Sequence, residues 1–313
     1  MAVGGRRVPG GASGGCGACG PGCRPHRWWW HQPVRQTLPP AGTRHHTGGM
    51  FHTAENIPAA TAAGTAERVP RRNRTARLRL FCFHHAGGSP WSFAGWGQHL
   101  GRGVEVVPVS MPPRSSAPGG VPGAVSTMDA LVREVTRQLT PFLDGPYAFY
   151  GHSMGSLVAH GAAQRIVAAG RRPPASFVAG AHRAPHLQAA PGPTVGLSDS
   201  ASLELLLGLG GAGRLLRESP ARMRSVVHRL REDLRVAATH RHPVAGHRPL
   251  PCPVHAMLGD RDPLVPTADA EAWRLHTSGP FSFRVLPGGH FFHREDKGRF
   301  FAELEDVLWD GVR

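Results

Sequence analysis

Short apolar runs alternate with helix-forming runs from about residue 78 onward, and this alternation restricts the fold more than any other feature of the sequence. The runs at 78–83, 104–109 and 281–286 have the length and the apolar content of buried strands. Apolar side chains recur at helical spacing over 128–143. Strands that alternate with helices predict an α/β fold, with a mostly parallel sheet and helices on both of its faces.

The other expected elements follow the same pattern until residue 190. Further strands are predicted at 147–150, 176–179 and 253–258, and further helices at 156–169 and 300–309. The stretch from about 190 to 240 breaks the alternation, because it is rich in Leu and Arg and contains no strand pattern. We interpret it as a helical lid inserted over one end of the sheet.

The first 74 residues have a different composition. They are rich in Gly, Pro and Arg, show no apolar periodicity, and carry ten Arg against two Glu. Such a segment cannot bury enough apolar surface to offset the entropy of ordering it. We therefore expect residues 1–74 to be a disordered extension and 75–313 to be the folded domain. No apolar segment follows Arg6 and Arg7, so the extension does not have the form of a secretory signal.

A group of possible metal ligands lies in this extension. Cys16, Cys19, Cys23 and His26 have the spacing C-x2-C-x3-C-x2-H, which suits zinc. Because no ordered framework is expected around them, we interpret the group as an accident of composition and predict no metal and no cofactor.

Composition excludes several classes of protein. No stretch approaches the roughly 18–20 consecutive apolar residues of a membrane-spanning helix, so we expect no membrane association. Five Cys in 313 residues do not make a dense disulfide framework, which favours a reducing, cytoplasmic location. The net charge of +15 attracts acidic partners, but no nucleic-acid recognition motif is present, so we predict no nucleic acid. We expect the chain to act as a monomer.

The pentapeptide Gly151-His152-Ser153-Met154-Gly155 matches the pattern G-x-S-x-G. In a chain this rich in Gly, about 0.3 matches arise by chance, and a second match around Ser13 lies in the extension. Only the copy at Ser153 follows a predicted strand and precedes a predicted helix, which is the context that a nucleophile elbow requires. Its sharp turn would strain the backbone at Ser153 and hold the hydroxyl beside a helix N-terminus.

A serine hydroxyl needs a base within hydrogen-bond reach, and the base needs an anion to orient it. Among 20 His, we select His290, because it follows the last predicted strand directly, whereas most others fall in the extension, in the lid or on predicted surfaces. Asp260 and Asp262 both follow the preceding strand. Asp262 lies further out on its loop and is the expected partner of His290, while Asp260 would brace the turn. The order Ser153, Asp262, His290 is that of an α/β-hydrolase triad.

Two backbone amides are expected to bind the developing oxyanion. We assign one to Met154, the residue after the nucleophile, and the other to Ala86, in the loop after the first strand. His84 and His85 in that loop admit a catalytic or metal-binding reading, but no carboxylate lies near them in the sequence. We favour the interpretation that they brace the loop.

These motifs together resemble the type II thioesterases that accompany nonribosomal peptide and polyketide synthases. The resemblance covers about residues 76–311 and is carried by the segments 83–89, 151–155, 180–185, 230–234, 259–262 and 287–292. It implies an α/β-hydrolase fold, a triad at Ser153, Asp262 and His290, oxyanion donors at Ala86 and Met154, and a lid over the acyl pocket. It also implies acyl or peptidyl carrier proteins as partners, from whose phosphopantetheine arm the acyl group is hydrolysed.

The sequence departs from that family at two places. His84 stands where the family usually has Pro, and residues 111–116 (MPPRSS) replace the usual Leu-Pro-Gly-Arg-x-x-Arg stretch. These differences bear on substrate range rather than on the chemistry. Three alternatives remain open: a small-molecule carboxylic ester hydrolase with the same triad, a cofactor-free acyltransferase or peroxidase of the same fold, and a non-catalytic binding module.

Overall fold

The computed structural model describes residues 76–115, 121–187, 198–210, 219–242 and 248–310. The predicted disordered extension, its four possible metal ligands and the second G-x-S-x-G match lie outside the described residues. In the part of the chain that is described, no helix is both long enough and apolar enough to cross a membrane.

Six strands form one sheet in which every neighbouring pair is parallel. They are β1 (Leu78–Phe83), β2 (Val104–Pro108), β3 (Tyr147–His152), β4 (Ser176–Gly180), β5 (Val254–Gly259) and β6 (Phe281–Leu286), in the order β2-β1-β3-β4-β5-β6. All six predicted strands are therefore confirmed, with ends that shift by at most two residues.

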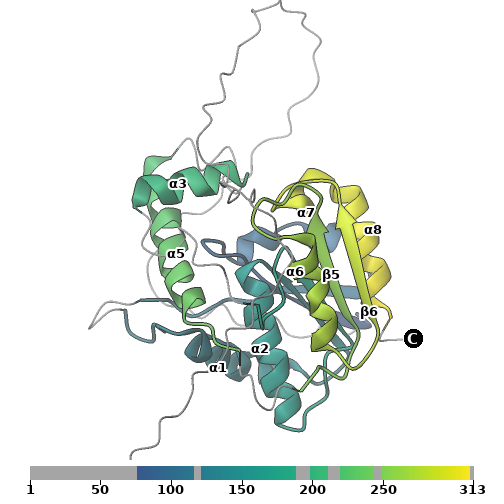
Figure 1. Ribbon diagram of the computed structural model, residues 1–313. Helices are drawn as coiled ribbons and strands as arrows, with labels where there is room; N and C mark the ends of the chain where they lie inside the picture. Colours follow the sequence, from purple (N-terminus) through teal and green to yellow (C-terminus); the bar gives the residue numbers. More distant parts are fainter. Residues whose placement is uncertain (1–75, 116–120, 188–197, 211–218, 243–247, 311–313) are drawn as a thin grey trace, which may run out of the picture. The chain divides into compact units, whose positions relative to one another are not determined.

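The helices connect these strands and cover the sheet (Figure 1). The α-helices are α1 (Met128–Leu139), α2 (Met154–Ala168), α3 (Asp199–Gly208), α5 (Pro220–Ala238), α6 (Thr267–Glu271), α7 (Phe292–Glu295) and α8 (Lys297–Leu308). Four short 3₁₀ segments, at Pro90–Phe93, Trp96–Gln98, Thr140–Phe142 and Ala272–His276, complete the described elements. The short helices were not predicted, because a single turn is too brief to show a period.

Helix ends follow local capping chemistry. The hydroxyl of Thr127 accepts a hydrogen bond from the amide of Ala130 at the start of α1, and Asp296 accepts one from the amide of Arg299 at the start of α8. The cap at Asp296 starts α8 three residues before the predicted beginning of the closing helix.

Alternating residues of the central strands build a core on each face of the sheet. On β1, Phe81 and Phe83 pack with α1 and α2, whereas Leu78, Leu80 and Cys82 pack with α8. All five are fully buried. A strand that is apolar on both faces belongs in the middle of a covered sheet, which agrees with the prediction of helices on both faces.

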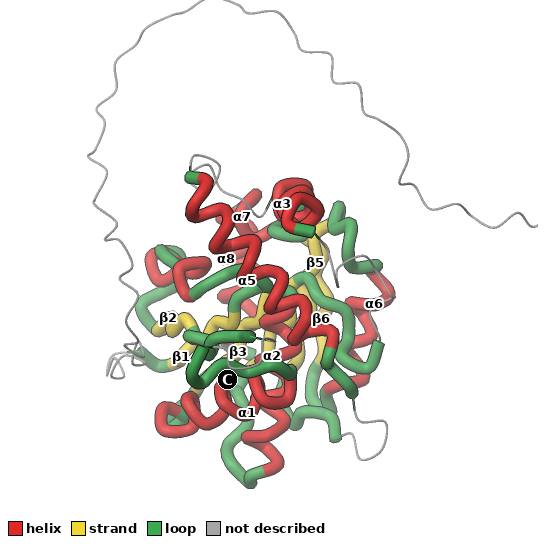
Figure 2. The backbone as a smooth tube through the Cα atoms, turned by 90° about the vertical axis from the view of Figure 1, so that its left-hand side faces the viewer, coloured by secondary structure: helices red, strands yellow, loops and turns green. Residues whose placement is uncertain are grey.

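The segment between β4 and β5 contains α3 and α5, in the range predicted to be a helical insertion. Figure 1 shows these two helices to the left of the strands, and Figure 2, viewed from that side, shows them in front. We call α3 and α5 the helical insertion. A fully buried carboxylate on α5, that of Asp233, links the insertion to the loop after β1.

The strand order creates one special position at the C-terminal ends of the strands. From β1 the chain moves outward to β2 and then returns past β1 to β3, so the connections leave β1 and β3 in opposite directions. Parallel α/β sheets bind ligands at such a switch point, beyond the carboxyl ends of the strands. The loops that follow β1 and β3 carry the predicted oxyanion donor and the predicted nucleophile.

Candidate active site

Ser153 lies at the turn between β3 and α2 in a conformation that L-residues rarely adopt. Its backbone has φ 54° and ψ −125°, which costs of order 1–3 kcal/mol in local strain. A Cβ at Gly155 would lie 2.1 Å from the carbonyl oxygen of Phe83, so only glycine fits where the first turn of α2 crosses the end of β1. The predicted elbow is therefore present, although α2 begins at Met154 rather than at residue 156.

Hydrogen bonds hold this turn in place. The amide of Ser153 donates to the carbonyl of Gly180 at the end of β4, over 2.8 Å. The buried hydroxyl of Ser156 donates toward the carbonyls of Gly151 and Gly180, at 2.9 and 3.2 Å. Ser153 itself remains partly exposed, so its hydroxyl is accessible at the surface of an otherwise buried turn.

The three side chains selected from the sequence meet in one hydrogen-bonded line. Nε2 of His290 lies 3.0 Å from Oγ of Ser153, and Nδ1 of His290 lies 2.9 Å from Oδ2 of Asp262. Because a carboxylate only accepts, Nδ1 of the neutral imidazole carries the hydrogen and Nε2 faces the hydroxyl as an acceptor. The side chains of His290 and Asp262 are 4% and 0% exposed, so water competes little with these bonds.

The two neighbouring aspartates have different partners. Oδ1 of Asp262 accepts from the amide of Leu264 at 2.8 Å, which fixes the carboxylate while Oδ2 faces His290. Oδ1 of Asp260 accepts from the amide of Gly288 at 2.8 Å, and its carboxylate pairs with Arg261. The expectation that Asp260 braces the turn is confirmed.

The two amides selected as oxyanion donors lie on either side of the switch point. Met154 is the first residue of α2, so its N–H has no acceptor within the helix. The N–H of Ala86 has no hydrogen-bond partner among the described residues. Both residues are buried, and α2 adds the positive end of its dipole to this region.

The loop after β1 is braced by its own histidines, as expected. Nδ1–H of His84 donates to the carbonyl of His85, and Nδ1–H of His85 donates to the carbonyl of Ala86, each over 2.9 Å. Burial lowers the pKa of His84 to about 4 and that of His85 to about 3, so both imidazoles are neutral near pH 7.

Two residues with contacts to this site were not identified from the sequence. Nε2–H of His152 donates to the carbonyl of His290 at 2.9 Å, while its Nδ1 accepts from the hydroxyl of Tyr150 at 3.0 Å. Asp233 accepts from the amide of Gly87 at 2.8 Å. His152 occupies a position that the G-x-S-x-G pattern leaves open, and Asp233 is 146 residues away from Gly87 in the chain.

Burial by itself does not single out His290. Seven other histidines in the described part of the chain are also buried: His84, His85, His152, His160, His255, His276 and His293. What distinguishes His290 is a hydrogen bond on each nitrogen, to a carboxylate at 2.9 Å and to a hydroxyl at 3.0 Å. His255 also has a hydroxyl at 2.7 Å from Nδ1, that of Ser282, but the carboxylate of Asp310 lies 3.9 Å from its Nε2.

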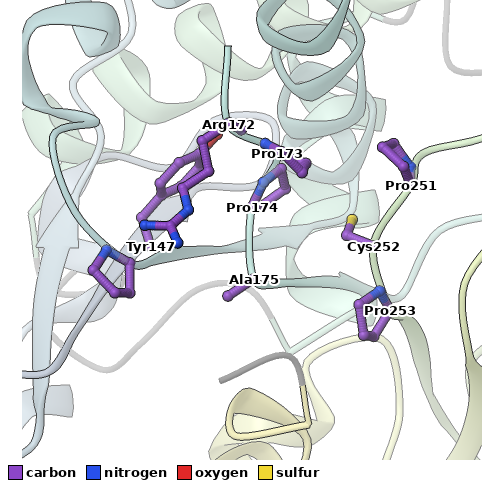
Figure 3. A pocket seen from close by; sticks show the side chains of 9 residues that line it. Tyr147, Arg172, Pro173, Pro174, Ala175, Pro251, Cys252 and Pro253 are labelled. Carbon is purple, nitrogen blue, oxygen red and sulfur yellow. The ribbon is translucent and has the colours of Figure 1, made fainter. Parts of the chain in front are cut away.

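A hollow of about 300 Å³ lies at the opposite ends of the strands (Figure 3). Prolines line much of it, together with Tyr147 and Cys252, at the points where β3, β4 and β5 begin. Burial raises the pKa of the Cys252 thiol to about 12, so the thiol stays protonated near neutral pH. This hollow is remote from Ser153 and does not belong to the hydrogen-bonded line.

Comparisons with known proteins give a consistent result. The family model of the thioesterase domain matches residues 78–308. Thioesterase PikA5 of Streptomyces venezuelae is 34% identical over 234 residues, which are 74% of this chain and 81% of the relative.

Two solved structures are similar over most of their length. The RedJ thioesterase from the prodiginine biosynthetic pathway of Streptomyces coelicolor has a TM-score of 0.67 and 34% identity, covering 79% of this chain and 96% of its own. The type II thioesterase BorB from the borrelidin biosynthetic cluster has a TM-score of 0.67 and 29% identity, covering 77% and 96%. These likenesses confirm the predicted α/β-hydrolase fold.

Proposed function

Because the chain belongs to the thioesterase family, we propose that it hydrolyses acyl thioesters on the phosphopantetheine arm of carrier proteins, with Ser153, His290 and Asp262 as its catalytic triad. The line of hydrogen bonds from Ser153 Oγ through His290 to Asp262 is the observation that carries this proposal. It supplies a nucleophile, a base of the correct tautomer and a buried anion that stabilises the imidazolium.

The proposed reaction has two steps. Ser153 Oγ attacks the thioester carbon while its proton moves to Nε2 of His290. The C–S bond then breaks, the leaving sulfur takes that proton from His290, and an acyl-serine beside a neutral imidazole remains. The pantetheine thiol has a pKa near 8–9, so it leaves with less help from a general acid than an amine needs. Water then gives a proton to His290 as it attacks the acyl-serine, which releases the free acid and restores the Ser153 hydroxyl.

We assign stabilisation of both tetrahedral intermediates to the amides of Ala86 and Met154. Three structural observations support this assignment. The amide of Met154 begins a helix, the amide of Ala86 has no partner in the described structure, and both lie where the loops after β1 and β3 approach each other. A preorganised amide of this kind contributes about 10²–10³ to the rate.

The carrier-bound substrate rests on two further observations. The similar proteins include a type II thioesterase, BorB, and a thioesterase of prodiginine biosynthesis, RedJ. Residues 75–313 have a net charge of +7, which is the total of +15 less the +8 of the first 74 residues. Arg222 and Arg224 expose part of this charge on α5, and a basic surface favours encounter with an acidic carrier protein.

A panel of acylated carrier proteins tests the proposed function. The purified chain is assayed for free acid with each carrier, with the matching pantetheine thioester and with a simple ester of the same acyl group. We expect kcat/KM to be at least about tenfold higher with the carrier than with either small substrate. Equal values for all three would favour the small-molecule ester hydrolase.

Covalent trapping tests the triad separately. A serine-directed phosphonate should label Ser153, as seen by intact mass and peptide mapping, and should not label the Ser153→Ala variant. Absence of labelling in a folded wild-type protein would favour a non-catalytic binding module.

A further inference from the structure

The Ala86 amide belongs to a loop whose backbone is held on both sides by side-chain hydrogen bonds. The peptide unit between His85 and Ala86 contains the Ala86 N–H at one end and the His85 carbonyl at the other. That carbonyl accepts two hydrogen bonds, from Nδ1–H of His84 at 2.9 Å and from the amide of Gly88 at 3.0 Å.

The next peptide unit, between Ala86 and Gly87, is fixed in the same way. Its carbonyl accepts from Nδ1–H of His85 at 2.9 Å, and its N–H donates to Oδ2 of Asp233 at 2.8 Å. When the peptide planes before and after a residue are both held, that residue has no backbone rotation left. The direction of the Ala86 N–H is therefore set by the side chains of His84, His85 and Asp233 together with the amide of Gly88.

Asp233 connects this loop to the helical insertion. Its carboxylate is fully buried on α5, and it also pairs with the guanidinium of Arg114, in the segment after β2. Gly87 has a φ of 75°, and a Cβ at this position would lie 3.0 Å from Cβ of Leu230 on α5. The helix thus packs directly against the loop, and the ion pair holds its carboxylate toward the Gly87 amide.

We propose that His84, His85 and Asp233 are positioning residues that fix the oxyanion-binding amide of Ala86, and that α5 and this loop form one unit. The inference rests on the proposed function of Ala86 as an oxyanion donor. It gives His84 a task that a proline at this position does not perform, because a proline side chain has no N–H to donate. A carbonyl that accepts two hydrogen bonds also polarises its peptide, which strengthens the N–H at the other end.

Two amide side chains at position 84 separate donation from packing. The amide nitrogen of Asn corresponds in reach to Nδ1 of histidine, whereas that of Gln corresponds to Nε2 and misses the His85 carbonyl. With p-nitrophenyl butyrate as substrate, we expect His84→Asn to keep kcat within about threefold of wild type. We expect His84→Gln to lower kcat about tenfold with KM within about twofold, because the amide is displaced rather than removed.

The rate of phosphonate inactivation gives a second readout, because the phosphonate adduct places an oxygen where the oxyanion forms. It should fall with kcat in His84→Gln and be retained in His84→Asn. Equal behaviour of the two variants, whether both active or both impaired, would overturn the assignment of His84.

A second pair of variants tests Asp233 without relying on position 84. We expect Asp233→Asn to lower kcat about tenfold, because an amide cannot accept from Gly87 and stay paired with Arg114. The neighbouring change Glu232→Gln affects a buried acid of the same helix that pairs with Arg235, and it should stay within about twofold. Equal kcat values in these two variants, at equal melting temperatures, would overturn the role of Asp233.

The Ser153→Ala variant in the same ester assay separates the two hypotheses. Undiminished hydrolysis by this variant would refute the proposed function. A strict dependence on Ser153 together with no difference between His84→Asn and His84→Gln would refute only the positioning role.

Discussion

The two ends of the parallel sheet each hold a nucleophilic side chain, and only one of them has neighbours that can activate it. At the C-terminal end, the hydroxyl of Ser153 lies 3.0 Å from the imidazole of His290. At the N-terminal end, burial raises the pKa of Cys252 to about 12, and its Sγ has no hydrogen-bond partner in the described structure (Figure 3). A thiol is intrinsically the better nucleophile, so the environment rather than the residue type decides reactivity here.

The backbone explains the same difference. The C-terminal end offers amide hydrogens, at Ala86 and at the start of α2, whereas the hollow at the N-terminal end is lined by five prolines. Proline has no N–H, so this lining is poor in backbone donors for a developing oxyanion, and the guanidinium that borders it, that of Arg172, is exposed to solvent. Catalysis is therefore expected only at the C-terminal ends of the strands, where Ser153 is accessible, and not at the hollow beside the N-terminal ends.

The largest expected effect comes from removing one nucleophile at each end. Ser153→Ala should lower kcat for thioester hydrolysis by at least about 10³-fold, because the residual rate would come from the oxyanion hole and binding alone. Cys252→Ala, at the other end, should keep kcat within about twofold. Free acid released from an acylated carrier protein is the measurement. A strong loss in Cys252→Ala with an unchanged melting temperature would contradict the comparison.

The second effect separates two aspartates at the same end. Asp262→Asn should lower kcat by about 10³-fold, because an amide can hold His290 in the wrong tautomer. Asp260→Asn retains an oxygen for the Gly288 amide and should stay within about fivefold of wild type. The reverse ranking of these variants would place Asp260 in the triad.

Acid should destabilise the molecule through its buried neutral histidines, several of which lie near the C-terminal ends of the strands. Burial lowers the pKa of His84 and His85 to about 4 and about 3, and it also lowers the pKa of His152 and His293. These groups titrate near 6.5 in the unfolded chain, so the unfolded state binds more protons as the pH falls from 6.5 toward 4. The free energy of unfolding then decreases by about 1.4 kcal/mol per pH unit for each such histidine.

Melting temperatures measured between pH 7 and pH 4.5 check this expectation. They should fall steeply below pH 6.5. They should fall less steeply in the His84→Asn variant, because this variant lacks one of the buried histidines that become protonated on unfolding. A melting temperature that is constant over this range would contradict the burial of neutral histidines. At the N-terminal end, burial raises the pKa of Cys252 and Tyr147, so these two groups respond to alkali. Burial also lowers the pKa of His255, at the start of β5, to about 4, so this end contributes to the acid response as well.

The smallest expected effect concerns surface charge. The double variant Arg222→Glu/Arg224→Glu on α5 should lower kcat/KM for an acyl-carrier substrate about tenfold, and added salt should reduce the difference from wild type. Arg171→Glu/Arg172→Glu changes two exposed residues next to the hollow at the N-terminal end and should stay within about twofold. Equal losses would show that only the net charge matters.

Most of the fold was predictable because its signals are local. Strand and helix periods need only the residues within each element, so all six strands and the long helices were identified, with errors mainly at the helix ends. The elbow was predictable for the same reason, since strand, turn, serine and helix are consecutive. Ser153, Asp262 and His290 were selected because each lies just beyond the end of a strand, and parallel strands bring such positions to one edge.

What the sequence could not indicate are contacts between side chains far apart in the chain. Nothing near His84 and His85 revealed that their imidazoles would hold the two peptide planes around Ala86, and nothing near Asp233 pointed to Gly87. These contacts depend on how α5 packs against the loop after β1, which is a property of the whole core.

The amino-acid sequence by itself thus determined the order of strands and helices, the elbow at Ser153 and the loops from which its partners come. Only the tertiary structure decided that the predicted His290 and Asp262 come into one hydrogen-bonded line with Ser153, and which groups hold the oxyanion loop. The physical reason is the separation along the chain over which each effect acts. Backbone periodicity and turn chemistry act between near neighbours in the sequence. Hydrogen bonding in this buried site depends on packing between elements that are more than 100 residues apart.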